Sequence, residues 1–164
     1  MIKGLHHNAY RCRDSEETRR FYEDFLGLPL ASTLDIAVTK TGRETSVLHT
    51  FYRMDDGSFL AFFEAPDSPF EFKAQHDFDL HIALEVEEPV LKAMFDKGKA
   101  QGIETRGIID HGFIHSIYFR DPNGYVIELT AKTPRHAAET DPVRSSARSK
   151  LDAWQAKKGP GSNF

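Results

Sequence analysis

The sequence has few of the features that mark secreted, membrane and nucleic-acid-binding proteins. Its 164 residues include one cysteine, Cys12, so no disulfide can form within the chain and a reducing cytoplasm is expected. It has no apolar run of the length that a signal peptide or a membrane span requires. The net charge of -4 provides no basic surface for nucleic acid. These absences predict a cytoplasmic protein that binds neither nucleic acid nor a membrane.

Strand and helix signals occur twice in the same order. Each half has an alternating strand, an amphipathic helix that ends at a glycine, and three further strands separated by Gly-containing turns. This pattern predicts an α+β fold of two β-α-β-β-β modules, about 1–65 and 77–132. The expected strands are 2–13, 31–39, 45–53 and 58–64 in the first half and 80–86, 103–109, 113–120 and 125–130 in the second, with helices at 15–26 and 88–101.

The repeat brings three metal-ligand types into register. His7 and His81 both lie in the first strand of their half, on the side that faces away from the helix. Glu128, in the last strand of the second half, is matched by Ala61, since each is four residues beyond its turn glycine. Two histidines and one glutamate would then converge where the modules face each other.

This set is the inventory of a facial triad, which holds a divalent metal and leaves coordination positions open for substrate and oxygen. Neutral imidazoles and a carboxylate suit Fe(II) or Mn(II). A bound cation would also explain Glu128, because a carboxylate in an apolar strand is costly to bury without a partner. Each residue has an ordinary alternative: His7 and His81 as strand histidines, and Glu128 on an exposed face.

Three stretches carry a family resemblance: residues 4–30, "GLHHNAYRCRDSEETRRFYEDFLGLPL"; 79–86, "DLHIALEV"; and 118–129, "YFRDPNGYVIEL". They resemble the vicinal oxygen chelate superfamily, which includes lactoylglutathione lyases, extradiol ring-cleaving dioxygenases and the bleomycin- and fosfomycin-resistance proteins. The resemblance covers about 1–132. It implies paired modules that form an open, cupped β-sheet, with a metal held inside by His7, His81 and Glu128.

Two departures from the family pattern narrow the reaction. Ala61 stands where lactoylglutathione lyases and related isomerases have a fourth ligand, which leaves more positions open on the metal. Gly57 and Ser58 stand where two-domain extradiol enzymes have an acid–base histidine. Tyr118 occupies the place of the substrate-binding tyrosine of the extradiol enzymes; the alternative is an aromatic residue of the core.

Other polar residues are weaker candidates for the site. His49 lies in a predicted strand from which it could serve as an acid–base group, and His111 and His115 bracket a predicted loop. Arg11 and Glu85 occupy matched positions beyond the two metal histidines. They either bridge each other across the sheet or orient a substrate, and Ala61 would line the same substrate space.

Three functions are compatible with these residues. The preferred hypothesis is an Fe(II) extradiol-type dioxygenase acting on a catechol-like or other vicinal-oxygen substrate with O2. The first alternative is a glyoxalase-like enzyme, epimerase or isomerase, or a fosfomycin-type transferase, that uses Mn, Ni or Zn as a Lewis acid. The second alternative is a metal-free protein that binds a small-molecule drug.

The C-terminal tail, 133–164, follows a different pattern. Asp141 and Pro142 predict a helix start, and the helix is expected near 142–158 with an apolar stripe. Its single tryptophan, Trp154, suggests that this helix docks on its own domain, over the site, or on a second subunit. Domains of this design commonly assemble in pairs, and a homodimer is therefore expected.

Overall fold

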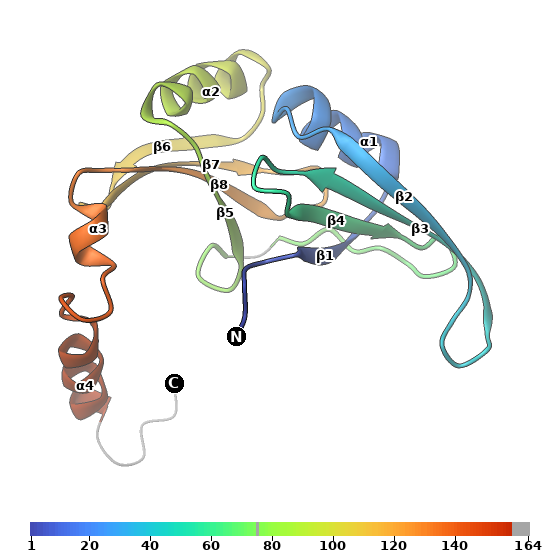
Figure 1. Cartoon of the computed structure of the whole chain (residues 1–164). Coiled ribbons are helices and arrows are strands. Elements are labelled where there is room, and N and C mark those ends of the chain that lie inside the picture. Colours follow the sequence, from blue (N-terminus) through green and yellow to red (C-terminus); the bar gives the residue numbers. More distant parts are fainter. Residues whose placement is uncertain (75, 159–164) are drawn as a thin grey trace. The chain divides into compact units, whose positions relative to one another are not determined.

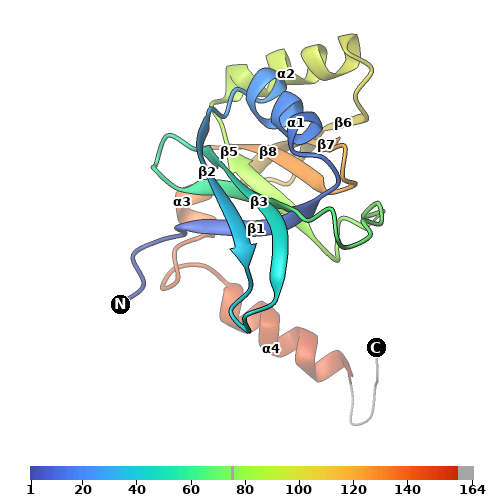
Figure 2. The same cartoon turned by 90° about the vertical axis from the view of Figure 1, so that its right-hand side faces the viewer.

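The computed structural model describes residues 1–74 and 76–158 (Figures 1 and 2), and over that range it contains two four-stranded β-sheets flanked by helices. The predicted α+β class and the repeated β-α-β-β-β order are confirmed. The strands are β1 His7–Cys12, β2 Leu30–Val38, β3 Glu44–Arg53, β4 Phe59–Glu64, β5 His81–Glu85, β6 Thr105–Asp110, β7 Ile114–Arg120 and β8 Val126–Lys132. The helices are α1 Ser15–Arg19, which continues as a π-helical stretch Arg20–Phe25, then α2 Glu88–Ala100, α3 His136–Glu139 and α4 Ala147–Lys158.

By its contacts the chain divides into two compact units. The first comprises residues 1–82 and 120–127, and the second comprises 83–119 and the chain from 128 onward. The predicted pairing of the two modules into one open cup stays a prediction. No helix among the described residues combines the length and the apolar character needed to cross a membrane.

The first sheet has the strand order β1-β4-β3-β2, with β1 parallel to β4 and the other pairs antiparallel. Its register separates two faces. Tyr52, Leu60 and Phe62 share the face that the π-helical stretch covers, where the rings of Tyr22 and Phe62 lie 4.6 Å apart. The opposite face, called here the open face of the first sheet, carries the residues that alternate with these. His7 lies on the open face because it pairs with Phe59.

Helix α1 begins at a capped residue and changes its hydrogen-bond pattern before it ends. The carboxylate of Asp14 accepts the amide of Glu17 at 2.7 Å, which satisfies one of the orphan donors of the first turn. From Arg20 the hydrogen bonds widen to the π pattern, and the stretch buries Phe21, Tyr22 and Phe25. The sequence predicted an ordinary helix here, since its apolar spacing does not distinguish the two patterns.

The second sheet has the strand order β5-β8-β7-β6 and is covered by α2. That helix lies close to the sheet at Gly98, where an added Cβ would meet the Phe119 ring at 2.6 Å and the Thr105 hydroxyl at 2.5 Å. Phe119 therefore belongs to the helix side of the sheet. Tyr118, its neighbour in β7, points to the other side, called here the open face of the second sheet.

The turn between β7 and β8 is fixed by a buried polar network within the first unit. The Asp121 carboxylate accepts the Tyr22 hydroxyl at 2.9 Å and the amides of Asn123 and Tyr125 at 2.9 and 2.8 Å. The Asn123 side chain accepts the Arg13 amide at 2.9 Å. The Asp-Pro-Asn-Gly sequence thus makes its own turn and is also bonded to Arg13, to Thr18 in α1 and to Tyr22 in the π-helical stretch.

The C-terminal tail differs in detail from the prediction. Helix α4 starts at Ala147, five residues later than the predicted start, and the short helix α3 was not predicted. The Asp141 carboxylate accepts the amides of Val143 and Arg144 at 2.8 and 3.0 Å, and this makes a turn that does not continue into α4. Gly159, the predicted helix stop, lies outside the described residues.

Candidate metal centre

Glu128 is a buried carboxylate on the open face of the second sheet. It lies in the middle of β8, its exposed fraction is 4%, and its Oε1 accepts the Tyr118 hydroxyl from β7 at 3.2 Å. The strand continues with Thr130, whose hydroxyl lies 3.3 Å from that of Ser116. Because side chains alternate along a strand, Glu128 and Thr130 share one face of β8. Glu128 therefore lies among polar side chains inside the fold, where its carboxylate can bind a metal ion.

Tyr118 links Glu128 to the loop between β6 and β7. Its hydroxyl oxygen lies 3.0 Å from Nε2 of His111, and the guanidinium of Arg106 lies 5.4 Å from the centre of its ring. His111, Tyr118 and Glu128 thus form a continuous hydrogen-bonded series. The sequence placed His111 beside a predicted loop but did not identify Tyr118 as its partner, because the β6–β7 pairing shifts register between Gly107 and Ile109.

His81, the first residue of β5, has a defined tautomer. Its Nδ1 lies 2.7 Å from the Asp77 carbonyl oxygen. Because a carbonyl oxygen only accepts hydrogen bonds, Nδ1 carries the proton and the lone pair is on Nε2. This is the arrangement of metal-binding imidazoles, which donate one ring N–H to a carbonyl or carboxylate and bind with the other nitrogen.

His7, the first residue of β1, is exposed and paired with its neighbour. The Nδ1 atoms of His6 and His7 lie 2.8 Å apart, so one ring donates to the other. The ring of Phe51 is 5.6 Å from that of His7, and the ring of His49 is 6.3 Å away. The open face of the first sheet therefore surrounds the candidate ligand with aromatic rings.

His49 is held firmly in the first unit. It is 6% exposed, its Nδ1 lies 3.0 Å from the Phe62 carbonyl, and its ring stacks on Phe63 at 3.7 Å with an interplanar angle of 11°. Its register partner is Phe63, which places it on the same face as His7. The carbonyl bond again leaves the lone pair on Nε2, the form in which an imidazole accepts a proton.

Ala61 is fully buried and opposite both Ala9 and Phe51. It lies on the open face of the first sheet, so the position that matches Glu128 in the repeat provides a methyl group there.

Arg11 and Glu85 each have partners within their own unit. Arg11 donates to the carbonyls of Ala65 and Ser68 at 3.3 and 3.0 Å, and Glu85 forms an ion pair with Lys132 at 2.6 Å.

The other candidate histidine, His115, lies on the helix side of the second sheet. Its Nδ1 is 2.9 Å from the Glu88 carboxylate in the first turn of α2. This agrees with the alternation from Tyr118, which directs His115 away from the open face.

The proposed triad spans the two units, since His7 and His81 belong to the first and Glu128 to the second. Within 1–74 and 76–158, no three His, Cys, Asp or Glu side chains are already gathered in the geometry of a metal site. The donor types nevertheless fit a divalent cation: one buried carboxylate and two imidazoles, one of them with its Nε2 lone pair fixed by a carbonyl. The triad stays a prediction.

A scan against family models matches residues 4–129 to the Glyoxalase/Bleomycin resistance protein/Dioxygenase superfamily. The chain belongs to this superfamily. The match ends within β8, one residue beyond Glu128, and so excludes α3 and α4. The predicted family is confirmed.

Named relatives of this superfamily member include fosfomycin-resistance enzymes. The metallothiol transferase FosB of Shouchella clausii is 26% identical over 144 residues, which cover 81% of this chain and 83% of FosB. A point mutant of the fosfomycin resistance protein FosX of Listeria monocytogenes, crystallised with Mn(II) and 1S,2S-dihydroxypropylphosphonic acid, is 21% identical with a TM-score of 0.61. That alignment covers 82% of this chain and 97% of the FosX chain.

A glyoxalase/dioxygenase of Nostoc punctiforme has a similar fold. Its TM-score is 0.62 at 23% identity, and the alignment covers 80% of this chain and 92% of that one. The fold is therefore shared by proteins of different named activities.

Proposed function

We propose that this protein is a metal-dependent enzyme that uses a divalent cation, held by His7, His81 and Glu128, to activate a small oxygen-bearing substrate. The observation that carries the proposal is the buried carboxylate of Glu128 on the open face of the second sheet, bonded by Tyr118 at 3.2 Å. A buried carboxylate is costly to ionise, and a cation offsets that cost.

The relatives favour Lewis-acid chemistry over the oxygen chemistry that the sequence first suggested. FosB is named a metallothiol transferase, and the FosX crystals contain Mn(II). We infer that this chain prefers Mn(II) or a similar ion and opens or adds to a strained or vicinal-oxygen substrate such as fosfomycin, with a thiol or water as the second reactant. When bound, the cation supplies electrophilic polarisation of a substrate oxygen.

The chain's own residues have three tasks in this proposal. The Asp77 carbonyl keeps the proton of His81 on Nδ1, so that Nε2 presents its lone pair. Tyr118 orients the Glu128 carboxylate through its hydroxyl. His49, fixed by the Phe62 carbonyl and by stacking, is a candidate to accept the proton of the attacking thiol or water at its Nε2.

Metal binding is the first test. Mn(II) affinity is measured by calorimetry on full-length protein and on the His81→Ala and Glu128→Gln variants, with His115→Ala as the matched control. We expect each ligand variant to bind at least about 100-fold more weakly and the control to stay within about twofold. Unchanged Mn(II) affinity in both ligand variants would overturn the triad.

The reaction is tested separately. Under argon with Mn(II), fosfomycin is incubated with a low-molecular-weight thiol or with water alone and followed by 31P NMR. Metal-dependent consumption that is lost in Glu128→Gln supports the proposal. Metal binding without turnover of fosfomycin or of other epoxides under any of these conditions contradicts the transferase and hydrolase assignment while leaving the metal site in place.

A second candidate is the Fe(II) extradiol-type dioxygenase. The favouring observation is the contact between the Tyr118 hydroxyl and Glu128, together with the absence of a carboxylate at Ala61. Anaerobic loading with Fe(II) followed by a catechol panel in air would give a yellow ring-cleavage product and oxygen uptake.

We also propose that the chain forms a homodimer. Sedimentation equilibrium of the full chain at micromolar concentration tests this, and a monomer mass would contradict it.

A further inference from the structure

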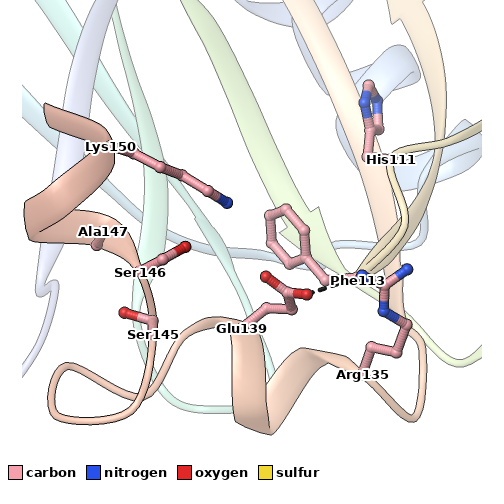
Figure 3. Close-up of a pocket in the computed structure, with 8 residues that line it drawn as sticks. All are labelled: His111, Phe113, Arg135, Glu139, Ser145, Ser146, Ala147 and Lys150. Carbon is pink, nitrogen blue, oxygen red and sulfur yellow. Dashed lines mark hydrogen bonds and ion pairs between the residues drawn. The ribbon is translucent and has the colours of Figure 1, made fainter. Parts of the chain in front are cut away.

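The second unit contains a pocket that none of the candidate metal ligands lines. Its volume is about 380 Å3, and its walls come from the β6–β7 loop, from α3 and from the start of α4 (Figure 3). Most of these walls lie beyond residue 129, where the superfamily match ends. The pocket is therefore a feature of this chain's tail, separate from the proposed catalytic function.

Positive charge exceeds negative charge around this pocket. Figure 3 shows the Lys150 side chain reaching from α4 toward the centre, with Arg135 on the opposite wall. Glu139 is the one carboxylate among the lining residues, and Arg135 binds it at 2.8 Å. The Arg135 hydrogen bond and charge lower the pKa of Glu139, and the Lys150 charge adds to this effect. One carboxylate thus faces one lysine and one arginine, and His111 adds an imidazole to the lining.

Neutral donors lie on the same wall as Lys150. Ser145 and Ser146 precede the 12-residue helix α4 and line the pocket together with Ala147, the first helical residue; the Ser146 hydroxyl points toward its centre (Figure 3). The first hydrogen bond along this helix runs from the Lys150 amide to the Ser146 carbonyl, so the amides of the preceding turn have no partner within the helix. Such amides and the helix dipole favour an anion.

The remaining walls limit what can enter. Phe113 contributes an aromatic face beside the charged groups (Figure 3). The Arg135 guanidinium lies beside Gly112, where an added Cβ would be 3.5 Å from a guanidinium nitrogen. The backbone amide of Arg135 is 3.3 Å from the Thr133 hydroxyl. The guanidinium is ion-paired with Glu139, and the pocket combines a polar end with an apolar surface.

We propose that this pocket binds a tetrahedral oxyanion, a phosphate or phosphonate group, with Lys150, Arg135, Ser146 and the start of α4 as its ligands. Donors from several directions suit three terminal oxygens better than the two of a carboxylate. Phe113 provides a surface for an organic substituent, so that a small phosphate monoester or phosphonate fits the site better than the free ion. His111, which lines the pocket and bonds Tyr118, connects this site to the series that ends at Glu128.

The test uses the full chain with the Glu128→Gln substitution, so that phosphate cannot report on a metal at the proposed triad. Inorganic phosphate and phenyl phosphate are titrated at pH 7 and constant ionic strength, with calorimetry and the fluorescence of Trp154 as readouts. Trp154 is the single tryptophan and lies one turn beyond Lys150 on α4. We expect saturable binding, with phenyl phosphate at least about fivefold tighter than phosphate.

Matched variants test whether phenyl phosphate binds in this pocket. Lys150→Gln and Arg135→Gln are expected to weaken phenyl phosphate at least tenfold, and Phe113→Ala is expected to remove its advantage over phosphate. Arg148→Gln, on the same helix but ion-paired with Asp152, is the control and should stay within twofold. Circular dichroism checks that α4 persists in each variant.

The outcomes separate this site from the metal centre. Loss of binding in Lys150→Gln with α4 intact supports the pocket whether or not Mn(II) binds elsewhere. Equal weakening in Arg148→Gln and Lys150→Gln would show non-specific attraction to a basic helix and overturn the proposal. Absence of saturable binding to either ligand would overturn it as well, and equal affinity for the two ligands would reject the organic monoester in favour of the free ion.

Discussion

The open faces of the two sheets differ although the strands that form them follow the same plan. On the first sheet this face is aromatic, with Phe51, Phe59 and Phe63 around His49 and His7. On the second sheet the corresponding face is polar and hydrogen-bonded, with Ser116, Tyr118, Glu128 and Thr130. The two modules therefore share a strand order but differ in side chains: His7 and His49 lie among aromatic rings on the first sheet, and Glu128 lies among hydroxyl groups on the second.

The strongest test of this difference between the two open faces is to place a carboxylate on the aromatic face of the first sheet. Ala61→Glu puts a charge at a fully buried position that is opposite Phe51 and Ala9, where no hydroxyl takes the role of Tyr118. In the absence of metal we expect the free energy of unfolding to fall by about 4 kcal/mol, because an unpaired charge is buried. Urea denaturation of the variant and of the parent protein measures this loss.

Ala61→Ser is the control for added polarity without charge and should cost far less. If Ala61→Glu unfolded at the same urea concentration as the parent protein, the two open faces would be equivalent in their tolerance of charge. The difference between an aromatic open face on the first sheet and a polar open face on the second would then not affect the burial of charge.

The two hairpin turns provide a second comparison. Asp121 is buried at the β7–β8 turn and accepts four hydrogen bonds from its surroundings, including that of the Tyr22 hydroxyl, whereas Asp56 is exposed at the β3–β4 turn and bonds Ser58. Asp121→Ala leaves buried donors without an acceptor and is expected to cost about 3 kcal/mol. Asp56→Ala is expected to cost less than about 1 kcal/mol. Thermal unfolding of both variants checks the difference.

The two carboxylates also respond oppositely to pH. Burial raises the pKa of Asp121, so its contribution to stability is present at low pH and is lost as the pH rises above its ordinary value of 3.8. Hydrogen bonds from Ser58 lower the pKa of Asp56, so its contribution is present at neutral pH and is lost on acidification below that value. Asp121→Asn and Asp56→Asn should therefore change the slope of stability against pH in opposite directions, and slopes of the same sign would contradict this assignment.

The helices are also held differently on the two sheets. The first is attached through the ring of Tyr22, and the second by close approach at Gly98. Gly98→Ala forces the Phe119 ring or the helix to move and should cost about 2 kcal/mol. Asp96→Ala, on the exposed side of the same helix, is the control and should change stability by less than about 0.5 kcal/mol. A neutral Gly98→Ala variant would show that the second helix is not close-packed.

The last prediction concerns the buried thiol of the first module, Cys12. Burial raises the pKa of Cys12 from 9.0 to about 11. Between these values the unfolded chain releases a proton that the folded chain keeps, so the free energy of unfolding falls as the pH rises, by up to about 1.4 kcal/mol per pH unit from this group. Urea denaturation at pH 8.5, 9.5 and 10.5 measures the slope. Cys12→Ala should flatten it, and an identical slope in that variant would assign the effect to other groups.

Much of the fold followed from the sequence because alternation and turn glycines are local signals. The eight strands and the helix α2 were predicted from them. The π-helical stretch was not, since its apolar spacing does not distinguish it from an ordinary helix. The start of α4 was misplaced because Asp141 has the composition of a helix cap and forms a separate turn.

The candidate site was predictable only in part. Register matched His7 with His81 and Glu128 with Ala61, and the resemblance to the superfamily selected His7, His81 and Glu128 as the ligands. The series from His111 through Tyr118 to Glu128 was not found, because it depends on a register shift in β6 that no spacing rule indicates. Asp77 was missed for a related reason: it acts through its backbone carbonyl, to which its side chain gives no clue.

The turn at residues 120–127 belongs by its contacts to the first unit, although the strands on either side of it are part of the second sheet. A half-chain that ended in the linker would therefore leave the Tyr22 hydroxyl and the Arg13 amide without Asp121 and Asn123. The first half of the chain, which depends on this turn of the second half, is therefore not expected to be a stable protein by itself.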